Sequence, residues 1–85
     1  MDAQSQIQRL NSSLINIISL YQDIIKEMDN VMTIIYNELG RPEGDELIRH
    51  TIHNSQVIVK RKLLEIDLIL ASIREEFGID NPILH

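Results

Sequence analysis

The chain has 85 residues, of which 44% are hydrophobic and 25% charged, with a formal net charge of −5 and no cysteine. This composition predicts a single folded domain over residues 1–85 and excludes disulfides and thiolate metal sites. The acidic charge disfavours nucleic acid and anionic membranes as partners, and no segment supplies the ~20 apolar residues of a membrane span. Without a basic secretory leader at the N-terminus, an intracellular location, cytoplasmic or nuclear, is expected.

Residues 4–39 are predicted to form the first helix, because apolar residues recur there at alternating steps of three and four. A second apolar series, one position later, makes the stripe wider than the seam of a two-stranded coiled coil. Ser5 and Gln8 have the spacing of a capping box, and Gly40 follows the helix where a left-handed residue is favoured. The interface residues expected in this helix are Ile7, Leu10, Leu14, Ile17, Ile18, Tyr21, Ile24, Ile25, Met28, Val31, Met32 and Ile35.

The second helix is expected at residues 45–77, after a loop at 40–44 and before a short tail at 78–85. Pro42 suits the first helical position, and Gly78 followed by Asp80-Asn81-Pro82 stops the helix. The same three-four pattern recurs between these signals. The interface residues expected in this helix are Ile52, Val59, Leu63, Ile66, Leu70, Ile73 and Phe77.

These elements predict an all-α fold, an antiparallel two-helix hairpin resembling a coiled coil. Further apolar residues lie outside the main stripes, so one helix is too narrow to cover the other, and a four-helix bundle with a partner is expected. The partner is a second copy or a different helical subunit. The residues outside the stripes are Ile15, Leu20, Ile34, Ile58, Leu68 and Ile69.

Polar residues add a prediction about register. In a hairpin folded at Pro42, the basic residues 60–62 lie opposite Asp23 and Glu27, and such complementary charges fix antiparallel register. Asn11 and Gln56 interrupt the apolar stripes, where polar residues penalise incorrect pairing.

Glu46, His50 and His53 share one helical face, a spacing that is compatible with metal binding. A zinc site needs further ligands, and neither an H-E-x-x-H nor a Cys-His pattern is present. The sequence therefore favours surface or interface histidines, with no metal, cofactor, catalytic residue or small-molecule substrate.

The segment from Arg49 to Ile58 resembles the phosphoacceptor stretch of sensor histidine kinases and phosphorelay phosphotransferases, in which an Arg-His pair precedes an Asn four residues later. The resemblance implies that His50 is the phosphoacceptor and that Asn54 orients it. Thr51 stands where that family has an acidic residue. Histidine phosphotransfer, or signalling through a dimerisation module, is therefore kept as the alternative function.

The overall pattern, an acidic N-terminus before two heptad-patterned helices and a short loop, resembles the small helical-hairpin subunits of Mediator-like assemblies. This resemblance implies a non-enzymatic role in holding a multiprotein complex together. The function expected from the sequence is therefore that of an assembly subunit, which binds protein partner helices through wide apolar helix faces.

Overall fold

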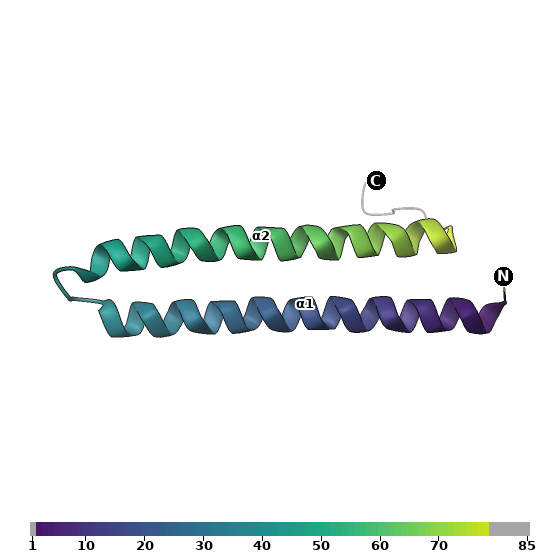
Figure 1. Ribbon diagram of the computed structural model, residues 1–85, viewed down its shortest axis with the longest axis horizontal. Helices are drawn as coiled ribbons and strands as arrows, with labels where there is room; N and C mark the ends of the chain where they lie inside the picture. Colours follow the sequence, from purple (N-terminus) through teal and green to yellow (C-terminus); the bar gives the residue numbers. More distant parts are fainter. Residues whose placement is uncertain (1, 79–85) are drawn as a thin grey trace.

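The computed structural model describes residues 2–78, and within them the chain is a hairpin of two long helices. Helix α1 (Ala3–Glu38) and helix α2 (Gly44–Phe77) run antiparallel and lie side by side (Figure 1). Each helix begins one residue earlier than expected, and α1 also ends one residue earlier. The all-helical, two-helix part of the prediction is confirmed. Most of the predicted tail, with Asp80, Asn81 and Pro82, lies outside the described residues.

The start of α1 differs from the prediction. The Asp2 carboxylate accepts a hydrogen bond from the Ser5 backbone N–H at 2.6 Å, so Asp2 is the N-cap residue. The predicted capping box of Ser5 and Gln8 is therefore wrong, because Ser5 is already inside the helix. A carboxylate at this position both satisfies a free N–H group and complements the positive end of the helix.

A glycine in the left-handed conformation follows each helix, and a turn around Pro42 precedes α2. Gly40 has a φ of 86°, which confirms the left-handed conformation expected after α1, and Gly78, where α2 was expected to stop, has a φ of 64° as well. The prediction for Pro42 is wrong, because Glu43 is the N-cap residue and Pro42 precedes it. The Gly44 N–H donates to the Arg41 carbonyl at 3.1 Å, which closes a turn around Pro42 before α2 begins.

Gly44 is buried where the start of α2 approaches the end of α1. A Cβ added there would overlap the carbonyl oxygen of Glu38 and lie 3.2 Å from the Glu38 Cβ. Since backbone would have to move, Gly44→Ala should lower the free energy of unfolding by about 1 to 3 kcal/mol, measured by urea denaturation at fixed chain concentration.

Gly40 provides the control, because a Cβ there meets no atom and only the left-handed backbone disfavours a side chain. Gly40→Asn should retain most of the parent stability, since Asn tolerates that conformation. An unchanged urea midpoint for Gly44→Ala would contradict the close approach of the two helices.

One column of predicted residues on each helix packs between the helices. It comprises Leu10, Ile17, Ile24 and Val31 on α1, and Val59, Ile66 and Ile73 on α2. Ile35 is half-buried beside it. Ile17, at 8% exposure, and Ile66, at 2%, are the buried apolar residues of the described chain. A hairpin with so few buried side chains has a very small core.

A second column of residues completes the contact between the two helices, which we call the seam. On both helices this column lies one position before the second column that the sequence predicted. Residues that the sequence left outside the stripes fill it, together with small and charged ones. They are Ser13, Leu20, Glu27 and Ile34 on α1, and Thr51, Ser55, Ile58, Lys62 and Ile69 on α2. Two helices bury only a narrow stripe of each other, so this rotation leaves the more apolar neighbouring column uncovered.

The hairpin is long and thin. Its radius of gyration is 18.4 Å and its longest dimension is 61 Å. A compact domain of this length has a radius of gyration of about 12 Å. The fold therefore presents far more surface than it can bury within itself.

Candidate interaction surface

The uncovered apolar column of α1 forms a continuous stripe along the helix. Its members recur at steps of three, four and seven residues, so they share one side of α1, and all are exposed. They are Ile7, Leu14, Ile18, Tyr21, Ile25, Met28 and Met32. The charged residues of α1 lie beside this stripe or on other sides of the helix, so none of them interrupts it.

Helix α2 contributes a matching stripe on the same side of the hairpin. Its exposed members are Ile52, Leu63, Leu70 and Phe77. An apolar groove of about 370 Å³ connects the two helices there, and residues from both line it, including Met28, Ile52, Gln56 and Val59. We call the exposed residues of the two stripes together the apolar face.

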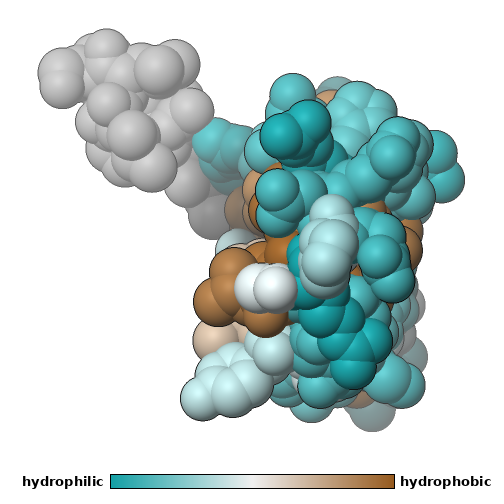
Figure 2. All heavy atoms as spheres, turned by 90° about the vertical axis from the view of Figure 1, so that its left-hand side faces the viewer, coloured by the Kyte–Doolittle hydropathy of each residue, from teal (hydrophilic) through white to brown (hydrophobic). Residues whose placement is uncertain are grey.

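The opposite side of the hairpin is more polar. A second hollow between the helices is lined by Asn16, Ser19, Leu20, Glu65 and Ile69. Seen from the loop end, hydrophobic side chains gather toward one side at the level between the helices, and the other side is mainly hydrophilic (Figure 2). The hairpin is therefore amphipathic as a unit.

Two ion pairs join the helices along the polar side. Lys62 Nζ lies 3.3 Å from Asp23 Oδ2, as the predicted pairing of basic and acidic segments requires, and Arg9 pairs with Glu76. The Asp23 side chain is 52% exposed and the Arg9 side chain 47%, so each pair contributes less than about 1 kcal/mol. Their main effect is to fix the register of the hairpin, because a slipped pairing would separate the opposite charges.

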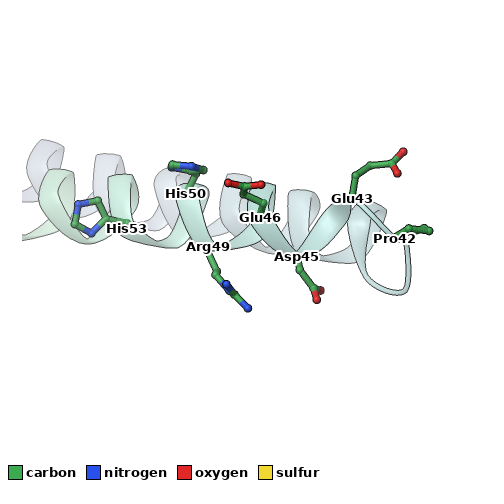
Figure 3. Close-up of a pocket in the computed structure, with 7 residues that line it drawn as sticks. All are labelled: Pro42, Glu43, Asp45, Glu46, Arg49, His50 and His53. Carbon is green, nitrogen blue, oxygen red and sulfur yellow. The ribbon is translucent and has the colours of Figure 1, made fainter.

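The candidate metal ligands and phosphoacceptor lie at the loop end of α2, around an open hollow of about 680 Å³. His50 and Glu46 rise on one side of the helix, and Arg49 and Asp45 point to the other (Figure 3). His50 and Asn54 are both exposed. Among residues 2–78, no group of three His, Cys, Asp or Glu side chains is arranged to hold a metal ion.

The polar positions also differ from what the stripes suggested. Asn11 and Gln56 are exposed, and Gln56 lines the apolar groove. The buried polar side chain of the described chain is instead Ser55, at 5% exposure, which sequence periodicity did not single out. A serine one position before the predicted stripe gives no hydropathy signal, so its burial depends on the rotation of α2.

The surface area of the chain is large for its mass. The chain exposes 6952 Å², whereas a folded monomer of 9.9 kDa usually exposes about 5,200 Å². This total includes the residues outside the described range, so only part of the excess belongs to the two helices and their loop.

Comparisons of the chain with protein-family models, with curated proteins and with solved structures found no match. Within the described residues, neither helix has a stretch long and apolar enough to cross a membrane. The function is therefore inferred from the surface itself.

Proposed function

We propose that the protein is a non-enzymatic assembly subunit that binds partner helices through its apolar face. The observation that carries the proposal is the apolar face, which extends along both helices on one side of the hairpin. Soluble monomers rarely expose a continuous apolar surface beyond a few hundred Å², and larger ones usually mark interaction sites. Partner helices packed on this face would complete a four-helix bundle.

The shape of the face supports helices as the partner. A helix that packs in a bundle inserts its side chains between rows of side chains on its neighbour, and residues at three-four spacing form such rows. Tyr21, Ile25 and Met28 on α1, beside the groove to α2, form such a row in the middle of the face. We infer that apolar burial supplies the affinity of the complex and that charges at the edges of the face orient it.

The experiment that tests this proposal is sedimentation equilibrium of the purified chain combined with thermal unfolding, at chain concentrations from about 1 to 100 μM. The chain by itself should not be a folded monomer, because the seam between α1 and α2 buries too little. It should either associate or remain largely unfolded until a partner is supplied. A monodisperse 9.9 kDa species that melts cooperatively, with a midpoint independent of concentration, would refute the proposal.

The alternative function is phosphotransfer through His50, and the exposure of His50 and Asn54 on one side of α2 favours testing it. If the chain is an assembly subunit, His50→Gln should change stability and association by no more than about 0.5 kcal/mol, as surface substitutions usually do. Urea denaturation and sedimentation measure both quantities.

The same variant tests phosphotransfer directly. After incubation with a small phosphodonor such as acetyl phosphate, we expect no acid-labile, base-stable phosphoryl adduct on the parent chain. A stoichiometric adduct that is lost in His50→Gln but kept in His53→Gln would replace the assembly function with the alternative one.

A further inference from the structure

We propose that the partner on the apolar face is a second copy of this chain, related by a two-fold axis that crosses the hairpin near Tyr21 and Leu63. The inference rests on the proposed function and adds the identity of the partner and the geometry of the complex. In this arrangement α1 packs against α1 of the second copy and α2 against its α2, with the loops at opposite ends.

The midpoints of the two stripes lie side by side in the hairpin. The ion pairs Arg9–Glu76 and Asp23–Lys62 fix which residues of the two helices lie side by side. In that register Tyr21 lies beside Leu63. Tyr21 is near the centre of the α1 stripe, 7–32, and Leu63 is near the centre of the α2 stripe, 52–77. A two-fold axis there maps most of the apolar face onto its own copy, namely residues 10–32 of α1 and 52–74 of α2.

Two opposite charges flank the middle of the α2 stripe. Lys60 and Asp67 lie one heptad apart on the edge of α2, and Lys60 also lines the apolar groove. Leu63 stands between them, three residues after Lys60 and four before Asp67. Antiparallel helices related by a two-fold axis at this midpoint bring Lys60 opposite Asp67 of the second copy, and the symmetry forms the pair twice.

The α1 stripe is uncharged. Two copies therefore pack there without like-charge repulsion. The face of the hairpin is thus complementary to itself in both position and charge. Lys60 and Asp67 thus form complementary pairs on either side of the axis, while Arg74, one heptad after Asp67, lies opposite the His53 region of the second copy and forms no such pair.

A charge reversal tests the pairing of the two copies. Lys60→Asp places two carboxylates opposite each other on both sides of the axis and should weaken the dimer about tenfold, measured by sedimentation equilibrium. Asp67→Lys should have a similar effect. When these two variants are mixed, both contacts become complementary again, so the mixed dimer should form at least as tightly as the parent.

Arg61→Asp is the matched control, since it makes the same change of charge at the neighbouring position, about 100° around the helix from Lys60. It should leave the dissociation constant within about twofold of the parent. If Lys60→Asp behaves like Arg61→Asp, or if the mixture does not recover association, the proposed axis is wrong.

Cross-linking tests the axis without a change of charge. The chain has no cysteine, so Leu63→Cys introduces a single thiol close to the axis, where it meets its own copy. Mild oxidation should convert most of this variant into a disulfide-linked dimer. Leu68→Cys, on an exposed side chain about 140° around α2 from Leu63, should cross-link only slowly.

The outcomes separate this inference from the proposed function. A dimer that cross-links through Leu63→Cys supports both. A chain that is unfolded and monomeric by itself overturns the second copy and leaves assembly with a different helical partner. A folded monomer overturns both, and a dimer that cross-links equally through Leu63→Cys and Leu68→Cys overturns the two-fold geometry.

Discussion

Replacing Ile66 by Asp is expected to abolish folding at chain concentrations at which the parent is folded. Ile66 is the most buried apolar side chain of the described residues, at 2% exposure, and lies in the seam against α1. An aspartate there loses the apolar contacts and buries a carboxylate without a partner, which costs several kcal/mol. Because a chain of this size has little stability in reserve, the cost exceeds what the seam supplies.

Far-UV circular dichroism and urea denaturation measure the effect. Ile66→Val is the control, since it keeps the apolar character and removes one methylene, for a cost of about 1 kcal/mol. Should Ile66→Asp retain the helical signal and the urea midpoint of Ile66→Val, the assignment of Ile66 to the seam of the hairpin would be incorrect.

Ile25→Asp is expected to weaken association by at least about 100-fold. Ile25 is 61% exposed in the hairpin and lies on the apolar face near its middle, so the change should cost the isolated hairpin little. In the complex the aspartate would be buried in an apolar interface, and a cost of about 3 kcal/mol or more corresponds to that loss of affinity.

Ile15→Asp is a closely matched control, because Ile15 is on the same helix, is 65% exposed and lies outside the apolar face. Sedimentation equilibrium should show Ile15→Asp associating like the parent, within about threefold. Equal weakening by the two substitutions would show that hydrophobicity in general, and not the apolar face, drives association.

The helical elements were predictable because their signals are local. The three-four spacing of apolar residues and the glycines at 40, 44 and 78 determine where the helices run and where they end, to within one residue at each end that the structure describes. The pairing of Lys62 with Asp23 was predictable as well, since a hairpin with equal arms has few registers that bring opposite charges together. The caps were less predictable, because Asp2 and Ser5 are both good N-cap residues.

Which residues each helix presents to the other was not predictable from periodicity. The apolar stripe is broad on both helices, and a broad stripe specifies no single line of contact. The structure selects a line that includes Ser55 and Lys62 and excludes Leu63, although hydropathy alone favours Leu63.

The sequence by itself thus determined the all-helical hairpin, its loop and its surplus of apolar surface, because spacing, turn residues and composition act over short distances. Only the tertiary structure decided how the surplus is distributed. Close approach at Gly44, packing around Ile17 and Ile66, and the ion pairs on the polar side depend on both helices at once. Together they rotate the helices so that most of the large exposed apolar residues, although not Ile15, Leu64 or Leu68, gather on one side of the hairpin, where they form a surface suited to a partner.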